Sequence, residues 1–398
     1  MERVEIKKDI FWVGAIDWNI RNFHGYTYST KRGTTYNAYL ILDKNITLID
    51  TVYGPFADEM IEKIREIVPL EKINYIIANH VEIDHSGALP ELLKLCPKAK
   101  VFGTAKCKEG LLRNFYCDMD FNIVKTLDKL NLGKRTLMFI EAPMIHWPDS
   151  MFTYCEEERM LFPNDAFGQH YATSKRFDDE VEFLELFDEA KKYYANILWP
   201  LSGVISKKID DIKKLKLKID MIAPSHGIIW RKNPFSIFES YISWSGNYTN
   251  KKVVIVYETM WGATEKLAKS LSQGIIDEGL EVKVYDLNQS DRTEIIKEML
   301  DAKGFMIGSS THDNDMLPNM AGFLEFLKGL KPKNRFAFVF GSYGWGGGAT
   351  KEIEDIIKEM KSELPFSSFS IQYAPSKEDL KNCYEIARKF AKILKGGQ

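Results

Sequence analysis

The sequence has 398 residues, of which 45% are hydrophobic and 28% charged, and its formal net charge is -2. This length predicts two or three domains of ordinary size. The near-neutral charge excludes the broad basic field that is typical of nucleic-acid-binding proteins. No uncharged apolar run approaches the length of a membrane span, and the segment after Met1 lacks the apolar region of a signal peptide. We therefore expect a cytoplasmic protein that binds neither nucleic acid nor membranes.

The cysteine pattern gives no sign of disulfides or of a cysteine-based metal site. The count is odd and no Cys-x-x-Cys pair occurs, so we expect reduced thiols in a cytoplasmic protein. The five residues are Cys96, Cys107, Cys117, Cys155 and Cys383.

The first 70 residues predict short strands followed by one helix. Residues 10–14 form an apolar strand, and residues 37–42 and 46–50 predict a hairpin with its turn at residues 43–45. Residues 55–68 have the apolar spacing of an amphipathic helix. His24 lies in a loop between the first strands.

The densest group of metal-competent side chains follows the next strand. Residues 73–79 are an apolar run typical of a buried strand, and residues 88–95 predict a helix that opens near Ser86. The segment between them therefore lies at the carboxyl end of a strand, where open α/β sheets gather ligands. The alternative for any one of these residues is a solvated polar loop. The segment contains His80, Glu82, Asp84 and His85.

Three further candidates also follow predicted strands. Residues 136–140 lead to His146, the paired strands at 151–154 and 159–163 lead to Asp165, and residues 221–225 lead to His226. Helices are predicted at residues 180–198, 206–217 and 234–244. Strands with helices outside them predict two β-rich halves in an αββα sandwich.

The spacing in residues 80–85 resembles the metallo-β-lactamase superfamily, whose loop reads His-x-His-x-Asp-His. Glu82 stands where that loop has its second histidine. A site that mixes histidine with several carboxylates suits iron or manganese better than zinc. A glutamate at this place resembles the flavodiiron proteins, which carry two irons on this fold.

After a polar linker at residues 245–252, strands and helices alternate five times. The strands are predicted at 253–257, 282–286, 304–309, 335–340 and 368–371, with helices beginning near residues 264, 293, 319, 350 and 376. This rhythm predicts a doubly wound parallel sheet. We expect two domains, a metallo-β-lactamase-like diiron domain at residues 1–248 and a flavodoxin-like domain at residues 249–398.

The first strand of this second half runs into a hydroxyl-rich loop that opens a helix. Backbone amides at a helix start, together with threonine hydroxyls, can bind a phosphate without a cationic side chain. The loop lacks the Gly-Lys-Ser/Thr of a Walker loop. With the loops after the third and fourth strands it resembles the FMN site of flavodoxins, although Asp313 stands where relatives usually have asparagine. The candidate FMN residues are Thr259, Met260, Trp261, Gly262, Ala263, Thr264, Thr311, His312, Asp313, Asn314, Ser342, Tyr343, Gly344, Trp345, Gly346 and Gly347.

Both halves, in this order, resemble the flavodiiron proteins over nearly the whole chain. The resemblance implies one iron held by His80, Glu82 and His146, and a second held by Asp84, His85 and His226, with Asp165 bridging them. The role of His85 stays open, because some relatives leave the equivalent histidine unligated. His24, His170, Tyr193 and Tyr194 are candidate pocket or proton-relay groups, and Asp50 is a candidate partner for a ligand imidazole.

The same resemblance implies the reaction and the partners. Two irons fed by FMN would reduce dioxygen to water or nitric oxide to nitrous oxide. The electron donor would be rubredoxin or a similar protein, and it must be a separate chain because this one lacks a pair of Cys-x-x-Cys motifs. A head-to-tail homodimer, or a dimer of dimers, would bring FMN of one subunit to the irons of the other.

Two alternatives stay open at this point. One is a zinc hydrolase fused to a flavodoxin module that only carries electrons, and Glu82 argues against it. The other is a non-catalytic flavin-binding sensor, which the complete ligand set argues against. The metal content of the purified protein separates the hydrolase from the reductase.

Overall fold

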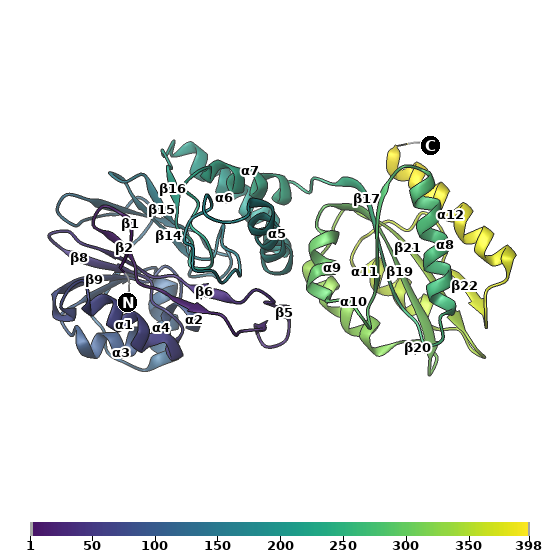
Figure 1. Cartoon of the computed structure of the whole chain (residues 1–398), viewed down its shortest axis with the longest axis horizontal. Helices are drawn as coiled ribbons and strands as arrows, with labels where there is room; N and C mark the ends of the chain where they lie inside the picture. Colours follow the sequence, from purple (N-terminus) through teal and green to yellow (C-terminus); the bar gives the residue numbers. More distant parts are fainter. Residues whose placement is uncertain (1–2, 397–398) are drawn as a thin grey trace. The chain divides into compact units, whose positions relative to one another are not determined.

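The computed structural model describes residues 3–396, which form two compact units (Figure 1). The first runs up to Tyr193 and includes Gly203–Ile242, and the second consists of Tyr194–Ser202 and the chain from Ser243 onward. The domain boundary between residues 248 and 249 stays a prediction. Among residues 3–396, no helix combines the length and the apolar character that crossing a membrane requires.

The N-terminal unit is a sandwich of two sheets. Its apolar core lies between them, where Ile41 and Ile77 of one sheet share a cluster with Phe139 and Phe162 of the other. The seven-stranded sheet has the order β1 (Val4–Lys7), β2 (Ile10–Trp12), β7 (Tyr39–Ile41), β8 (Ile46–Ile49), β9 (Ile73–Ile77), β10 (Lys100–Gly103) and β11 (Phe121–Ile123). The five-stranded sheet has the order β12 (Lys129–Asn131), β13 (Thr136–Glu141), β14 (Met151–Cys155), β15 (Met160–Phe162) and β16 (Met221–Ile222).

Helices cover the outer faces of both sheets, which confirms the predicted αββα arrangement (Figure 1). Two small hairpins stand apart from the main sheets, and the second of them carries His24. The helices are α1 (Ala57–Arg65), α2 (Ile83–Ser86), α3 (Leu89–Leu95), α4 (Ala105–Phe115), α5 (Phe183–Tyr193), α6 (Ser202–Lys214) and α7 (Pro234–Ser245). The small hairpins pair β3 (Ala15–Asp17) with β6 (Thr34–Tyr36) and β4 (Asn22–Phe23) with β5 (Tyr28–Ser29).

The structure differs from the predicted elements in a few places. The single helix expected over residues 180–198 is α5 followed by a π-helical turn at Tyr194–Leu198, and a 3-10 turn at Trp199–Leu201 carries Pro200, which cannot donate a helical hydrogen bond. Strands β11 and β12 were not predicted, because each is only three residues long and neither contains a buried residue. Asp84 and His85 lie in the one-turn helix α2 rather than in an open loop.

The C-terminal unit has one main sheet whose central strands are parallel. Its order 2-1-3-4-5 in chain sequence is the flavodoxin-like one, so the predicted doubly wound sheet is confirmed. The strands, in sheet order, are β18 (Glu281–Asp286), β17 (Asn250–Glu258), β19 (Ala302–His312), β21 (Phe336–Tyr343) and β22 (Phe369–Gln372), and β20 (Asp315–Met316) pairs antiparallel with β19.

Helices cover both faces of this sheet. Helices α8 and α12 lie on one face, and α9, α10 and α11 lie on the other (Figure 1). The carboxyl ends of β17, β19 and β21 therefore meet at one edge, between the two helical layers. The helices are α8 (Ala263–Asp277), α9 (Arg292–Met299), α10 (Pro318–Leu330), α11 (Ala349–Glu359) and α12 (Lys377–Lys395).

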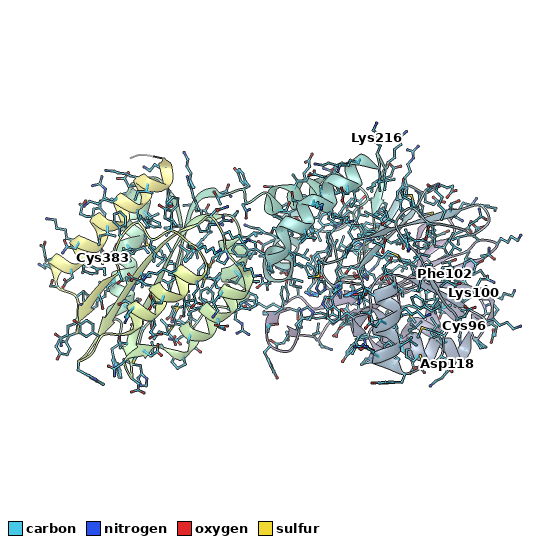
Figure 2. All side chains as sticks on the ribbon, turned by 180° about the vertical axis from the view of Figure 1, so that it is seen from behind. Cys96, Lys100, Phe102, Asp118, Lys216 and Cys383 are labelled. Atoms are coloured by element: carbon cyan, nitrogen blue, oxygen red, sulfur yellow. The ribbon has the colours of Figure 1, made fainter. Side chains whose placement is uncertain are left out.

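All five cysteines are free thiols, and four of them are buried. Cys96 follows α3 in the N-terminal unit, and Cys383 lies on α12 in the C-terminal unit (Figure 2). Burial raises the pKa of Cys96 to about 11, so this thiol is uncharged at neutral pH.

Candidate functional site

The seven predicted metal ligands converge in the N-terminal unit as two groups. Each residue in a group offers a ligand atom, and the atoms within a group lie within 4.8 Å of one another. The first group is His80, Glu82, His146 and Asp165, and the second is Asp84, His85 and His226.

Asp165 joins the two groups, because each of its oxygens faces a different one. Its Oδ2 lies 3.2 Å from His146 Nε2 and 3.6 Å from His80 Nε2. Its Oδ1 lies 2.9 Å from His85 Nε2 and 3.5 Å from His226 Nε2. One carboxylate placed between two histidine pairs has the arrangement that a bridging ligand requires.

The spacing of the ligand atoms suits metal ions. Two ligands each about 2.1 Å from a metal lie roughly 3.0–3.4 Å apart at octahedral or tetrahedral angles. Glu82 Oε2 lies 3.3 Å from both His80 Nε2 and His146 Nε2, and Asp84 Oδ2 lies 3.1 Å from His226 Nε2. Within residues 3–396, neither side-chain oxygen of buried Asp84 accepts a hydrogen bond. Buried carboxylates without donors fit cation ligands.

Two of the ligand imidazoles, those of His80 and His226, are oriented by hydrogen bonds from the nitrogen that faces away from the centre. Nδ1 of His80 lies 3.0 Å from Asp149 Oδ2, and Nδ1 of His226 lies 2.7 Å from the carbonyl oxygen of Thr35. These contacts leave Nε2 of each ring directed at the centre. Asp149 was not among the predicted residues, although it lies only three positions after His146 at the end of the same loop.

Asp50 does not orient an imidazole. Its carboxylate accepts hydrogen bonds from the backbone N (2.8 Å) and the side-chain amide (3.0 Å) of Asn79. Asp50 therefore fixes the backbone just before His80, which is a different role from the predicted one.

The electrostatics of the site keep its carboxylates charged. Burial alone would favour the neutral acid of Glu82, but hydrogen bonds with His146, His24 and His80 hold its pKa far below the usual range. Burial likewise opposes the charge of Asp165, and the neighbouring His85 and His146 lower its pKa. Hydrogen bonds to these carboxylates in turn raise the pKa of His146 against the effect of burial, so the imidazoles carry protons that a bound cation would displace.

Of the two histidines predicted as relay groups, His24 contacts Glu82 and His170 is buried beside His226. Nε2 of His24 lies 3.1 Å from Glu82 Oε1, so His24 does contact the candidate centre. His170 is fully buried, its Nδ1 lies 2.8 Å from Thr34 Oγ1, and its ring lies 4.9 Å from that of His226. Burial and the nearby His226 lower the pKa of His170, which keeps this ring neutral.

Tyr193, rather than Tyr194, lies beside the histidines. The ring of Tyr193 is 5.1 Å from that of His170 and 6.3 Å from that of His226. The hydroxyl of Tyr194 lies 3.0 Å from Ser202 Oγ, and its ring contacts Trp244 at 5.2 Å. Successive side chains of a helix point about 100° apart, so only one of these two neighbours can face the histidines.

A cavity of about 400 Å³ opens over the candidate metal centre. Glu82 and Asp84 form part of its floor, and Trp147 contributes an apolar wall while its ring lies 5.2 Å from that of His80. The remaining lining residues include Phe23, His24, Tyr36, Tyr53 and Asn114. A mostly apolar cavity of this kind admits small neutral molecules.

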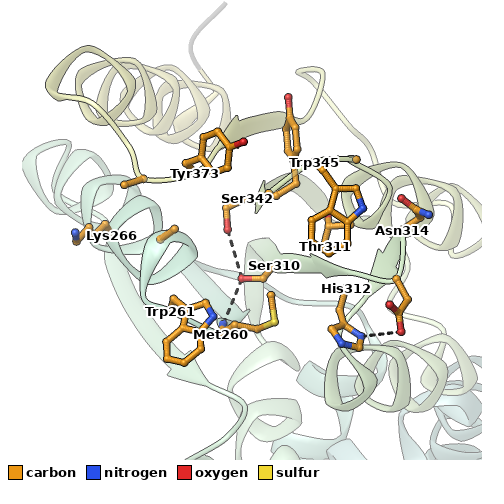
Figure 3. Close-up of a pocket in the computed structure, with 16 residues that line it drawn as sticks. Met260, Trp261, Lys266, Ser310, Thr311, His312, Asn314, Ser342, Trp345 and Tyr373 are labelled. Atoms are coloured by element: carbon orange, nitrogen blue, oxygen red, sulfur yellow. Dashed lines mark hydrogen bonds and ion pairs between the residues drawn. The ribbon is translucent and has the colours of Figure 1, made fainter.

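A second cavity, of about 330 Å³, lies in the C-terminal unit at the carboxyl ends of its strands (Figure 3). The three predicted loops meet there, but Thr259, Gly262, Thr264 and Gly347 are not among its lining residues. Four lining residues were not among the predicted ones, namely Lys266, Ser310, Tyr373 and Ala374. The lining is Met260, Trp261, Ala263, Lys266, Ser310, Thr311, His312, Asp313, Asn314, Ser342, Tyr343, Gly344, Trp345, Gly346, Tyr373 and Ala374.

A cluster of hydroxyls ties the three loops together. Thr264 Oγ1 lies 3.1 Å from Ser310 Oγ and 2.9 Å from Ser342 Oγ, so the start of α8 is bonded to the ends of β19 and β21. Gly262, the residue before α8, has φ +79° and makes no side-chain cap. The first backbone amides of α8 therefore have no side-chain acceptor from the capping position and are available to bind an anion.

Three aromatic side chains around this cavity are largely exposed to solvent. Trp261 is 93% exposed, Trp345 85% and Tyr373 69%. Such exposure of large rings is unusual unless they meet a ligand or partner. A phosphate loop beside exposed rings fits a flat, phosphorylated cofactor such as FMN.

Comparison with known proteins agrees with both sites. Residues 34–227 match the family described as ODP family beta lactamase, and residues 255–386 match the flavodoxin family. The chain is 52% identical over 390 residues to a nitric oxide reductase of Moorella thermoacetica, covering 98% of each protein. It is 40% identical to an anaerobic nitric oxide reductase flavorubredoxin of Escherichia coli, covering 98% of this chain and 82% of that protein.

Solved structures have the same fold over the full length. The rubredoxin oxygen:oxidoreductase of Desulfovibrio gigas superposes with a TM-score of 0.97 at 36% identity, covering 99% of each chain. The flavodiiron protein of Giardia intestinalis gives a TM-score of 0.96 at 34% identity, covering all of this chain and 97% of that one.

Proposed function

Because the chain belongs to the flavodiiron protein family, it is an oxidoreductase, and we propose that it reduces nitric oxide or dioxygen at a non-haem diiron centre with FMN as the electron carrier. One observation supports this most directly. The two oxygens of Asp165 face separate histidine and carboxylate groups, so the site has the donors for two metal ions.

The donor set favours iron over zinc. Glu82, Asp84 and Asp165 supply three carboxylates to a site completed by imidazoles. Hard oxygen donors stabilise ferric iron, whereas zinc sites favour histidine and cysteine. The competing zinc hydrolase needs an imidazole at position 82, and the chain has a carboxylate there.

We propose the ligand roles that the resemblance implies. His80, Glu82 and His146 would hold one iron, Asp84, His85 and His226 would hold the other, and Asp165 would bridge them. The 2.9 Å contact between His85 Nε2 and Asp165 Oδ1 is compatible with His85 as a ligand of the second iron. When bound, the iron pair supplies two electrons and FMN supplies two more, which it can pass on singly.

The protein's own residues shape the path of the substrate. His24 donates a hydrogen bond from Nε2 to the Glu82 carboxylate at the cavity wall and is one-third exposed, so it lies where protons can enter from solvent. Phe23 and Trp147 make the cavity apolar, which suits uncharged diatomic gases. His170 is neutral and supports His226 from behind through Thr34 and ring contacts.

Nitric oxide is the substrate that we place first. The relative at 52% identity, higher than the other relatives described above, is a nitric oxide reductase. Dioxygen is the second candidate, because the rubredoxin oxygen:oxidoreductase has nearly the same fold over its whole length. Nitric oxide coupling to nitrous oxide uses two electrons, whereas reduction of dioxygen to water uses four.

We also infer the partners and the setting. We propose that the electron donor is rubredoxin or a similar protein, because residues 1–398 contain no Cys-x-x-Cys motif and do not themselves supply a rubredoxin site. We propose a cytoplasmic head-to-tail homodimer, or a dimer of dimers, because FMN must approach the irons to deliver electrons. Its free cysteines agree with a reducing compartment.

The test is a parallel assay of both gases under anaerobic control. Consumption of nitric oxide and of dioxygen is measured with chemically reduced rubredoxin, while iron, zinc and FMN are quantified on the same sample. About two irons and one FMN per chain, with fast consumption of nitric oxide, supports the proposal. Zinc in place of iron, without consumption of either gas, supports the hydrolase instead.

A further inference from the structure

The cavity of the C-terminal unit has a single lysine in its wall. Lys266 lies on α8 and is exposed to solvent. The only other residues of the lining that can carry charge on an acidic or basic side chain, apart from tyrosine hydroxyls, are His312 and Asp313, and His312 Nδ1 lies 3.3 Å from a carboxylate oxygen of Asp313. Lys266 is therefore the one uncompensated cation of this cavity.

The position of Lys266 follows from helix geometry. It lies three residues after Ala263, so the two share a face of α8, and Ala263 directly follows the phosphate loop. Figure 3 shows Lys266 on the α8 side of the cavity, with Trp345 and Asn314 on the opposite side. The side chain is thus held one helical turn from the amides that face an anion.

The next lysine on the same helix provides a contrast. Lys269 pairs with Glu265 at 2.5 Å, which neutralises both charges, and it does not line the cavity. Within residues 3–396, Lys266 makes no ion pair. A long cationic side chain on the cavity wall, left without an acidic partner, suits an anionic ligand.

We propose that Lys266 selects a phosphorylated flavin over an unphosphorylated one, by attracting the phosphate that the loop amides and the hydroxyl cluster hold. This inference rests on the proposed binding of FMN. A phosphate monoester carries nearly two negative charges at neutral pH, whereas riboflavin carries none. The attraction acts through a solvent-exposed side chain, so it is modest and is screened by salt.

The experiment uses the full-length protein after removal of its flavin. Dissociation constants for FMN and for riboflavin are measured by quenching of flavin fluorescence, at low salt and at about 0.5 M salt, where the screening length is only a few ångströms. The variants are Lys266→Met, Lys266→Arg and, as the matched control, Lys269→Met. Circular dichroism confirms that each variant is folded.

We expect Lys266→Met to weaken FMN binding about five-fold at low salt, which corresponds to the upper end of the interaction energies of exposed ion pairs. Riboflavin binding should not change, the difference should shrink at high salt, and Lys266→Arg and Lys269→Met should match the parent protein. Equal FMN affinity in Lys266→Met and the parent, or an equal loss for both flavins, overturns the inference. Failure of the parent protein to bind FMN overturns the proposed function instead.

Discussion

The carboxylate of Asp149 binds both the ring of His80 and the backbone that directly follows it. Its Oδ2 lies 3.0 Å from Nδ1 of His80 and accepts a 2.7 Å hydrogen bond from the backbone amide of Val81. Both carboxylate oxygens are within reach of the ring, and Asp149 and His80 are buried. The ring and the backbone that carries it are therefore fixed together, so the direction of Nε2 depends on this one aspartate.

We expect Asp149→Asn to weaken iron binding by about 10- to 100-fold, because partners of ligand imidazoles have effects of that size. An amide keeps the shape but loses the charge that favours the donor form of Nδ1. Iron per chain and the apparent affinity for ferrous iron are measured, with FMN content as an internal reference. Asp118→Asn, at an exposed position (Figure 2), is the control. Full iron retention in Asp149→Asn contradicts the orienting role.

We expect Glu82→His to shift metal retention from iron toward zinc and to abolish reductase turnover, while FMN stays bound. The change removes a carboxylate that meets His80, His146 and His24, and it adds the imidazole that zinc sites favour. Metal analysis after purification in medium containing both metals, together with gas consumption, checks this. Full turnover of the variant with either metal contradicts the carboxylate argument.

We expect Gly348→Ala to disrupt the flavin cavity. A Cβ atom at Gly348 would lie 1.7 Å from the backbone oxygen of Asn314, so the loop after β19 must move. Overpacking of this kind costs about 1–3 kcal/mol, and FMN affinity should fall as well. Gly344→Ala is the matched control, because Gly344 lines the same cavity and a Cβ there meets nothing within 4 Å. Thermal unfolding and FMN titration are carried out on both variants. Equal unfolding temperatures and equal FMN affinities of the two variants contradict the prediction.

We expect removal of iron to destabilise the N-terminal unit and to leave FMN binding unchanged. Glu82, Asp84 and Asp165 bring three carboxylates together, and a bound cation offsets their repulsion. A ligand at 100 times its dissociation constant stabilises the folded state by about 2.7 kcal/mol. Calorimetry before and after chelation, with flavin fluorescence recorded in parallel, measures the change. Readdition of ferrous iron should restore the original transition, and an unchanged transition after chelation contradicts the expectation.

The sequence was most informative where metal-binding side chains directly follow predicted strands. Residues 80–85, His146, Asp165 and His226 all follow apolar strands, and the resemblance to the flavodiiron proteins implied that they converge on one centre. The five strands of the C-terminal sheet were predicted because each is a short apolar run between helical segments. Both fold predictions are confirmed by the sheet orders and the family matches.

The sequence was less informative about residues that act through other residues. Asp149 was not predicted, because its partner His80 lies 69 positions away. Tyr193 and Tyr194 are neighbours with the same chemistry, and which ring meets His170 depends on which face of α5 is turned toward the site. Lys266 and Tyr373 were missed because nothing local marks a lysine or a tyrosine as facing a cavity.

The candidate ligands lie far apart along the chain, so the ribosome makes some of them well before the others. Sixty residues separate Asp165 from His226, and strand β16 must join its sheet before His226 can take its place. At about 5–20 residues per second, a ribosome needs roughly 3–12 s to make that stretch. The nascent chain therefore offers its first ligands to any metal in the cell for seconds before the last one exists, so the choice between iron and zinc has to be made, or corrected, after His226 has emerged.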